Sequence, residues 1–317
     1  MKTMSKKCLY CYKELDREGD FHSSCSIRFF GSSEPPILDY TMSEMAELAK
    51  EVVESSVTVP GVQPKLSLGF IKNVLQEGNK GRLTVIGALG GNCILKPQNE
   101  IFPQMPENEH LTMRIAEFCG ISVVPSTLIR LKSGELSYLT KRIDRTETGE
   151  KIHMLDMFQI LEAFDKYKNS VEKVGKAVAE HSSNTLLDLL RLFEVVLFCY
   201  ITGNNDMHLK NFSLLLSNQN WTLAPAYDLL NVSLHISEDT EETALTIGGK
   251  KRKLTKSDFV NLGLSFQLTE KQIFNTFERF IKVEKKLKKE IKSSFLSLEN
   301  QMKYIELLET RLNLFKG

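Results

Sequence analysis

The most informative stretch of this sequence is Gly203-Asn204-Asn205-Asp206-Met207-His208-Leu209-Lys210-Asn211. It is followed seventeen residues later by Asp228. In phosphotransferases, one Asp orients the attacking hydroxyl, while an Asn and a later Asp hold the metal that bridges the nucleotide phosphates. Here Asp206 and Asn211 are five residues apart, and each of the two acids lies at the end of an apolar run. A lone loop Asp most often forms an Asx-turn. Two acids and an Asn in this order instead predict phosphoryl transfer.

The composition is that of an ordinary globular protein. The chain has 317 residues, of which 42% are hydrophobic and 26% charged. Its net charge of +1 gives no global basic field, so direct binding to nucleic acid is not expected. The basic runs at 250–253 and 284–289 contain no interleaved aromatic residues, and we interpret both as solvated faces.

The sequence does not predict secretion or a membrane span. Three lysines near the start are not followed by the apolar region of a signal peptide. The most apolar stretch, residues 186–202, is interrupted by the charged residues Asp188, Arg191 and Glu194, so a buried helix is expected there. A cytoplasmic location is therefore predicted.

Three of the six cysteines lie in the first 25 residues together with a histidine, in the pattern Cys8-x2-Cys11-x10-His22-x2-Cys25. Two close pairs separated by a short loop are the spacing of a tetrahedral zinc site. Such a site would be structural, because four protein ligands leave no open position. The alternative is a reduced, partly disordered leader whose cysteines share no ligand. The other three cysteines, Cys93, Cys119 and Cys199, have apolar neighbours and are expected in the core.

The order of predicted elements changes from mixed sheet to helix along the chain. A Gly/Ser/Pro-containing joint at 31–39 is followed by a helix over 41–54, with Ser43 as a possible N-cap. Strands are expected at 66–72, 83–88 and 92–96, then a helix over 107–119, then strands at 123–131 and 136–143. From about residue 154 the periodicity is mostly helical, ending in charged helices at 268–315.

Six motifs in matching order resemble the HipA family of bacterial toxin serine/threonine kinases. They are Gly61-Val62-Gln63-Pro64-Lys65, Ile94-Leu95-Lys96-Pro97, Glu107-Asn108-Glu109, Lys141-Arg142-Ile143-Asp144-Arg145, the Gly203–Asn211 loop and Ala226-Tyr227-Asp228. The resemblance covers residues 55–260. It implies an α+β, two-lobed protein-kinase-like fold with a Cys/His leader at 1–35, a mixed-sheet N-lobe at 36–145 and an all-helical C-lobe at 146–317.

The front of the chain departs from this family. Only the Cys/His leader and one helix stand where full-length HipA has an N-terminal subdomain. The shortened form resembles the HipT branch, in which that subdomain is a separate small protein of the same operon. A HipS-like small protein and a HipB-like DNA-binding antitoxin are the partners that the resemblance implies.

The resemblance also implies a site for ATP. Lys96, on an apolar strand, would pair with the nucleotide phosphates and with a carboxylate of the next helix. Glu109 is the family's choice for that carboxylate, and Glu107 stays open. Taken alone, Lys96 could equally be a strand-end lysine reaching into water. The flexible cover over the phosphates would be formed by Pro60, Gly61, Val62, Gln63, Pro64 and Lys65, although a plain β-turn is the commoner outcome for such a stretch.

Further nucleotide contacts follow from the same resemblance. Lys141, Arg142 and Ile143 would form the hinge whose main chain meets the adenine edge, and Asp144 would meet the ribose. Gln159 matches a family position near the active site.

The catalytic loop would act on ATP and Mg²⁺ together. Asp206 is the expected base, and Asn211 and Asp228 are the expected magnesium ligands. His208 and Lys210 would neutralise charge on the transferring phosphate. Tyr227 would pack on the nucleotide.

Just before Gly61, the sequence resembles the family's autophosphorylation site. Ser56 and Thr58 are two apart on one expected strand face, and the sequence does not decide which is modified. A phosphate there would add negative charge close to the ATP phosphates, so reduced activity is expected. The alternative is that both residues simply suit a solvated hairpin.

Three functions are compatible with this sequence. The favoured one is a kinase toxin that phosphorylates a component of translation; an aminoacyl-tRNA synthetase is implied by resemblance only. The second is a small-molecule or lipid kinase of the same fold, because a catalytic loop does not name its acceptor. The third is a degenerate kinase that acts as a binding module. The acceptor, the cognate antitoxin and the oligomeric state cannot be read from the chain.

Overall fold

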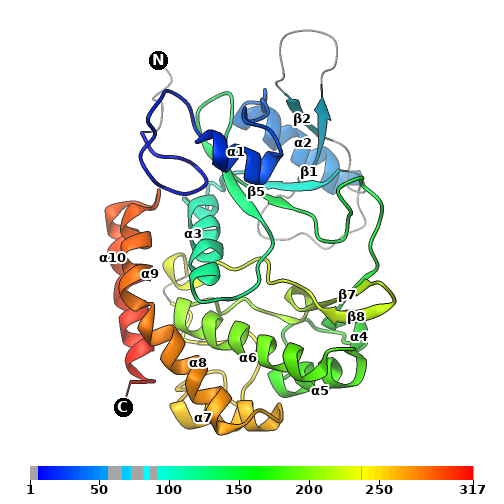
Figure 1. The fold of residues 1–317 in the computed structure, drawn as a ribbon, viewed down its shortest axis with the longest axis vertical. Helices are drawn as coiled ribbons and strands as arrows, with labels where there is room; N and C mark the ends of the chain where they lie inside the picture. The colour runs from blue at the N-terminus through cyan, green and yellow to red at the C-terminus, as the bar shows by residue number, and fades with distance from the viewer. Residues whose placement is uncertain (1–5, 56–65, 73–80, 86–90, 237, 317) are drawn as a thin grey trace. The chain divides into compact units, whose positions relative to one another are not determined.

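The computed structural model of the chain describes residues 6–55, 66–72, 81–85, 91–236 and 238–316 (Figure 1). The chain divides into two compact units. The first contains residues 1–110, 124–151 and 293–295, and the second contains residues 111–123, 152–292 and 296–317. The domain boundaries predicted at 35 and 145 stay predictions.

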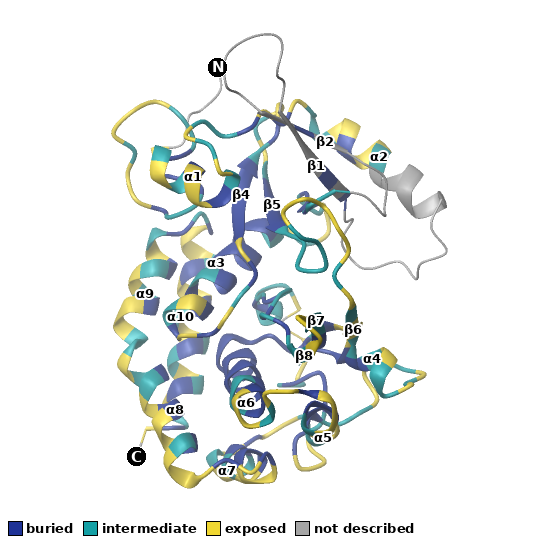
Figure 2. Ribbon diagram, turned by 45° about the vertical axis from the view of Figure 1, so that its right-hand side comes forward, coloured by how far each residue is buried: buried dark blue, intermediate teal, exposed yellow. Residues whose placement is uncertain are grey.

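The first unit is built on a five-stranded antiparallel sheet with the order β2-β1-β3-β5-β4. Leu66 and Leu68, two residues apart on β1, are fully buried, as alternation along a strand requires. Figure 2 shows β4 and β5 in the buried colour. The strands are β1 (Leu66–Lys72), β2 (Gly81–Val85), β3 (Cys93–Lys96), β4 (Ser126–Arg130) and β5 (Leu136–Lys141).

The N-terminal segment packs into the core of this unit. The helix α1 (Ser23–Phe30) ends at Gly31, which has a φ of 74°, the left-handed conformation that favours glycine at a helix end. Phe29 of α1 is buried in the same hydrophobic cluster as Met45 of α2 (Met42–Ser55) and the leucines of the sheet. The described part of the leader is therefore folded onto the sheet.

The helix α3 (Met105–Phe118) begins in the first unit and ends in the second. Residues 106–113 are all buried, including the polar residues Glu107, Asn108, Glu109 and His110. Polar groups at such positions need partners inside the protein.

The second unit is mainly helical. Its long apolar helix α6 is buried on most sides and packs against α5 and α10 (Figure 2). Ser170, Thr255, Thr269 and Ser297 cap α5, α7, α8 and α10 with their hydroxyl groups. The helices after α3 are α4 (Met157–Ile160), α5 (Val171–His181), α6 (Thr185–Thr202), α7 (Lys256–Ser265), α8 (Glu270–Lys282), α9 (Glu284–Ser293) and α10 (Leu298–Asn313).

A small sheet departs from the all-helical C-lobe expected from the sequence. Three antiparallel strands have the order β6-β7-β8, and the 3-10 helix η1 (Leu209–Asn211) directly precedes the middle strand. The strands are β6 (Met154–Asp156), β7 (Ser213–Ser217) and β8 (Asn220–Leu223). This sheet fixes the end of the Gly203–Asn211 loop.

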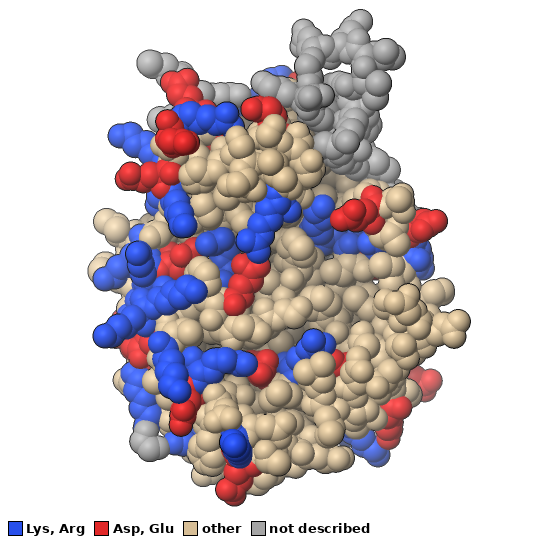
Figure 3. Space-filling model, viewed as in Figure 1, with Lys and Arg blue, Asp and Glu red and all other residues tan. Residues whose placement is uncertain are grey.

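The basic run at 284–289 lies on α9. Leu287 and Ile291 are the buried side of this helix, whereas Lys285, Lys286 and Lys289 are exposed. Figure 3 shows Lys and Arg side chains gathered over this part of the surface, where Figure 1 places α9 and α10. The run is thus the polar side of an amphipathic helix.

Among the described helices, none has the length and apolarity needed to cross a bilayer.

Candidate active site

The Gly203–Asn211 loop begins where α6 ends. Gly203 has a φ of 73°, and a Cβ atom there would lie 2.5 Å from Leu307 and 2.8 Å from Asn231. Only glycine fits such a position. The chain can therefore turn sharply from the buried helix into the loop, which presents the next polar residues at the end of an apolar element.

Hydrogen bonds within the loop hold Asp206 and Asn211 together. The Asp206 carbonyl oxygen accepts from the His208 N–H at 2.8 Å and from Asn211 Nδ2 at 3.2 Å. Asn205 Nδ2 donates to Asp239 Oδ2 at 2.8 Å and to the Glu241 carbonyl oxygen at 3.0 Å, which ties the loop to a later segment. These bonds pre-organise the loop and place the Asn211 side chain against the Asp206 main chain.

Asp206 has a partner that the sequence did not reveal. The Tyr167 hydroxyl donates to Asp206 Oδ1 at 2.7 Å, and burial together with this bond raises the pKa of Tyr167. The Tyr167 ring also meets the His208 ring edge-on, with 5.2 Å between centroids. Tyr167 lies 39 residues before Asp206 in a polar loop, and no local pattern marks it as functional.

His208 favours its neutral form. Burial lowers its pKa and the Lys166 charge lowers it further, against the opposing effects of Asp206 and Asp228. Lys166 Nζ lies 3.0 Å from His208 Nε2 and can only donate, so Nε2 accepts and Nδ1 carries the proton. Within the described residues, His208 Nδ1 is buried without a hydrogen-bond partner. This nitrogen can therefore donate to an oxygen of a bound group. Because the neutral form of His208 is favoured, the side chain would neutralise less phosphate charge than the sequence predicted.

Asn211 and Asp228 offer the donor atoms that magnesium prefers. Carboxylate and amide oxygens are hard ligands suited to this ion. Asn211 Nδ2 donates to the Asp206 carbonyl oxygen. Asn211 Oδ1 is therefore the atom of this side chain that could coordinate a metal ion. Asp228 has a φ of 60°, a conformation uncommon outside glycine that is often found at functional sites. Both the donor set and the orphaned His208 Nδ1 fit a magnesium-bound phosphate.

Tyr227 connects the Asp228 segment to the catalytic loop. Its hydroxyl donates to the Lys210 carbonyl oxygen at 2.9 Å and lies 2.5 Å from the Ser213 hydroxyl on β7. Burial raises the pKa of Tyr227. The Tyr227 hydroxyl thus holds the Asp228 segment against the loop and β7. The packing of Tyr227 on the nucleotide stays a prediction. Lys210 itself is exposed, with Nζ 4.9 Å from the centre of the Phe158 ring.

In the first unit, Lys96 and Glu109 form a buried ion pair. Lys96 Nζ donates to Glu109 Oε1 at 2.6 Å, with the Lys96 and Glu109 side chains only 6% and 2% exposed. Glu107, the alternative partner, instead accepts from Gln98 Nε2 with both oxygens. Of the two carboxylates left open by the sequence, the structure pairs Glu109 with Lys96.

The predicted hinge is held by backbone hydrogen bonds. The Lys141 N–H donates to the Pro125 carbonyl oxygen at 3.0 Å, and the Arg142 N–H donates to the Asn92 carbonyl oxygen at 2.8 Å. Ile143 has no such backbone bond within the described residues. The contact of this run with an adenine edge stays a prediction.

Asp144 is engaged by two arginines. Its Oδ2 accepts from Arg142 at 2.7 Å and from Arg145 at 2.6 Å. Burial raises the pKa of Asp144, but the hydrogen bond from Arg142 and the charges of both arginines outweigh burial and hold it below its usual range. Asp144 is thus an anion in a fixed position, and its contact with a ribose stays a prediction.

Gln159 has a structural role at the start of α4. It forms a reciprocal capping box with Asp156 at the start of α4, in which the Gln159 N–H and the Asp156 N–H each bond to the other's side chain. Its side chain is exposed. The predicted nucleotide contact of Gln159 stays untested.

The proposed cover loop and phosphorylation sites lie outside the described residues. They are Ser56, Thr58, Pro60, Gly61, Val62, Gln63, Pro64 and Lys65.

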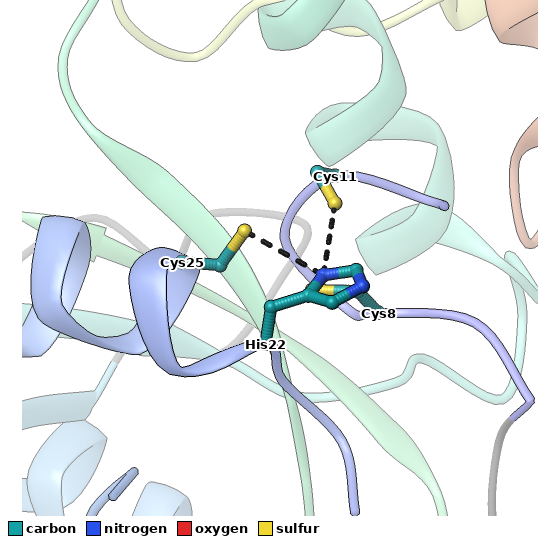
Figure 4. Close-up of side chains that lie close together, drawn as sticks. All are labelled: Cys8, Cys11, His22 and Cys25. Atoms are coloured by element: carbon teal, nitrogen blue, oxygen red, sulfur yellow. Dashed lines mark hydrogen bonds between the residues drawn. The ribbon is translucent and has the colours of Figure 1, made fainter. Parts of the chain in front are cut away.

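The four N-terminal metal-ligand candidates are brought together. Figure 4 shows Cys8, Cys11, His22 and Cys25 directed toward one another, and their ligand atoms all lie within 4.8 Å. Cys25 comes from α1 and His22 from just before it, whereas Cys8 and Cys11 come from the preceding loop. The cluster could hold a metal ion.

One substitution tests the contact between Tyr167 and Asp206. Tyr167→Phe keeps the ring and its edge contact with His208 but removes the hydroxyl that orients the carboxylate. Because a hydrogen bond to a charged group contributes about 1.5–3 kcal/mol, we expect the turnover of ATP to fall by about tenfold or more. The apparent KM for ATP should not change. Steady-state kinetics would show this, and an unchanged or higher turnover would mean that the phenol does not position Asp206.

The chain matches the model of the HipA-like C-terminal domain over residues 57–288. A Haemophilus influenzae protein named "Putative kinase" is 30% identical over 212 residues, which are 62% of this chain and 59% of that protein. "Putative kinase Y4dM" of Sinorhizobium fredii is 31% identical over 236 residues, or 69% and 56% of the two chains. "Serine/threonine-protein kinase toxin HipA" of Shewanella oneidensis is 27% identical over 208 residues, or 59% and 45%. The chain thus spans about half the length of these relatives.

Solved structures share the fold. A chain of the Shewanella oneidensis complex of HipA, HipB and operator DNA aligns with a TM-score of 0.65 and 19% identity, over 84% of this chain and 69% of that one. The Helicobacter pylori proinflammatory kinase CtkA aligns with a TM-score of 0.53 and 14% identity, over 79% and 95%. These likenesses confirm the predicted kinase-like fold. With the match to the family model, which includes the catalytic loop, Lys96, Glu109 and Asp228, they show that the chain belongs to the HipA family.

Proposed function

We propose that this chain is an ATP- and Mg²⁺-dependent serine/threonine protein kinase. The observation that carries the proposal is the pre-organised loop in which Asp206 is oriented by Tyr167 while Asn211 is bonded to the Asp206 carbonyl. The names of its relatives support kinase activity at 27–31% identity.

The residues divide the chemistry between them. Asp206 accepts the proton of a serine or threonine hydroxyl as its oxygen forms a bond to the γ-phosphorus and the bond to the ADP oxygen breaks. Lys96, held by Glu109, binds phosphate oxygens, and His208 donates a hydrogen bond from Nδ1. Asn211 and Asp228 would hold Mg²⁺, which when bound neutralises charge on the phosphates.

We further propose that the kinase is the toxin of a toxin–antitoxin system. Support comes from the relative named as a toxin and from the structural neighbour solved with HipB and its operator DNA. A HipB-like antitoxin is the corresponding partner. A HipS-like small protein, and an aminoacyl-tRNA synthetase as acceptor, rest on the family resemblance alone. We propose the cytoplasm as the location of this reaction, since ATP is available there.

Autophosphorylation gives the first test. Incubation with ATP and Mg²⁺ should add about 80 Da per phosphate to the intact mass of the wild type. Fragment spectra should place the phosphate on Ser56 or Thr58, and the Ser56→Ala/Thr58→Ala double variant should gain no mass. A mass gain that persists in the double variant would refute the assigned sites. No gain in the wild type, combined with ATP binding, would favour a small-molecule kinase instead.

A further inference from the structure

The strongest feature that phosphoryl transfer does not use is the Cys8–Cys11–His22–Cys25 cluster. A tetrahedral zinc ion bound by thiolates and an imidazole keeps its ligand atoms about 3.4–3.8 Å apart. His22 Nδ1 lies 3.4 Å from Cys11 Sγ and 3.9 Å from Cys25 Sγ. These two separations are close to the ones that a bound ion would require, and all four ligand atoms lie within 4.8 Å of one another.

The second nitrogen of His22 fixes which atom would bind. His22 Nε2 lies 2.8 Å from the Glu14 carbonyl oxygen, which can only accept a hydrogen bond. Nε2 must then carry the proton, and Nδ1 presents its lone pair to the three sulfur atoms. A ligating histidine commonly donates its other N–H to a carbonyl in this way.

The donor set selects zinc and a structural role. Three soft sulfur ligands and one imidazole suit zinc rather than magnesium or calcium. Four protein ligands complete the tetrahedron, so no position remains for water or substrate. The three cysteines of the cluster are free of disulfide bonds.

The residues next to the ligands enter the core of the first unit. Leu9, between Cys8 and Cys11, is fully buried, and Phe29, one turn after Cys25, is buried in the sheet cluster. Tyr12 directly follows Cys11 and has a φ of 61°, a strained conformation for a bulky residue. A metal bound at Cys11 would hold the chain in this conformation.

Tyr12 connects the cluster to the ion pair of the same unit. Its hydroxyl lies 2.8 Å from His110 Nδ1, and the two rings meet edge-on with 5.3 Å between centroids. His110 directly follows Glu109 on α3, and Glu109 pairs with Lys96. Tyr12 therefore links the Cys/His cluster to the first turns of α3, and Glu109 links the same turns to Lys96.

We propose that Cys8, Cys11, His22 and Cys25 bind one structural zinc ion, and that this ion, through Tyr12 and His110, holds the helix segment that carries Glu109. The zinc site itself does not depend on the proposed kinase function. Only the consequence for ATP binding rests on that function.

Zinc content and helix protection provide the test, both measured without ATP. The purified full chain should contain one zinc ion, and after exchange with Co²⁺ it should show the visible absorption of a tetrahedral thiolate site. Cys25→Ser should lose the metal, lower Tm by about 5 °C or more, and speed amide hydrogen exchange at residues 105–110. Ile27→Ala, at an exposed position of the same helix, should keep the metal, the Tm and the exchange rates.

Tyr12→Phe separates the metal from its connection to α3. This variant should retain one zinc ion but exchange faster at residues 105–110, because the bond to His110 is lost. A wild-type protein without stoichiometric zinc, or a Cys25→Ser variant with unchanged metal content, would overturn the zinc site. Unchanged exchange at 105–110 in both variants would overturn the connection to Glu109. If zinc and exchange behave as expected but the wild type does not bind ATP, the proposed kinase function fails while the zinc site stands.

Discussion

Asp206→Asn is expected to lower phosphoryl transfer by about 10²- to 10⁴-fold, the range that a positioned general base contributes. Asparagine keeps the shape of the side chain and can still accept from Tyr167, so the loop should keep its conformation. What is lost is the carboxylate that accepts the proton of the attacking hydroxyl. Initial rates of ADP formation, together with ATP titration by calorimetry, should show a large loss of rate and little change in ATP affinity.

Asp239→Asn is the matched control for this substitution. Asp239 is also a carboxylate that holds the loop, through its bond to Asn205, but it does not bond to Asp206. The rate of phosphoryl transfer by Asp239→Asn should stay within a few-fold of the wild-type rate, since Asn205 also bonds to the Glu241 carbonyl. If Asp239→Asn were as damaging as Asp206→Asn, the effect would reflect loop disorder rather than the loss of a base.

Lys96→Met is expected to abolish ATP binding and to destabilise the protein. It removes the cation that we propose to bind the phosphates, and it deprives the buried Glu109 carboxylate of its ion pair with Lys96. Removing one partner of a buried ion pair lowers the free energy of unfolding by about 3–5 kcal/mol. The double variant Lys96→Met/Glu109→Leu removes the buried carboxylate as well, so it should recover most of the stability while still failing to bind ATP. Chemical denaturation and calorimetry measure the two effects separately.

Glu107→Gln provides the comparison for Lys96 and Glu109. It changes a second buried carboxylate on the same turn of α3, whose partner is Gln98 rather than Lys96. Its ATP affinity should be close to that of the wild type. ATP binding by the double variant at wild-type affinity would show that the buried pair supports the fold and not the nucleotide.

Much of the first unit could be predicted because its elements carry strong local patterns. The helix predicted over 41–54 is α2 (Met42–Ser55), and the strand predicted over 66–72 is β1 (Leu66–Lys72). The sheet order and register could not be predicted, because they depend on which strands meet in space. The small sheet of the second unit was missed since β6 has only three residues and shows no clear alternation of polar and apolar side chains.

The proposed catalytic residues could be named from the sequence because Asp206, Asn211 and Asp228 are close together in the chain. The contacts that tune them are not local. Tyr167 meets Asp206 across 39 residues and Lys166 meets His208 across 42. Burial, which shifts the pKa of His208 downward, likewise arises only when the surrounding elements pack.

The most direct measurement is the transfer of label from γ-labelled ATP to protein. A phosphatase-treated bacterial extract would be incubated with Mg²⁺ and either the wild type or Asp206→Asn, and the labelled proteins would be analysed for phosphoserine and phosphothreonine. The account predicts label on serine or threonine of at least one extract protein with the wild type and none above background with Asp206→Asn. Equal labelling by both proteins, or no labelling by a wild type that binds ATP, would contradict the claim that this chain is a protein kinase acting through Asp206.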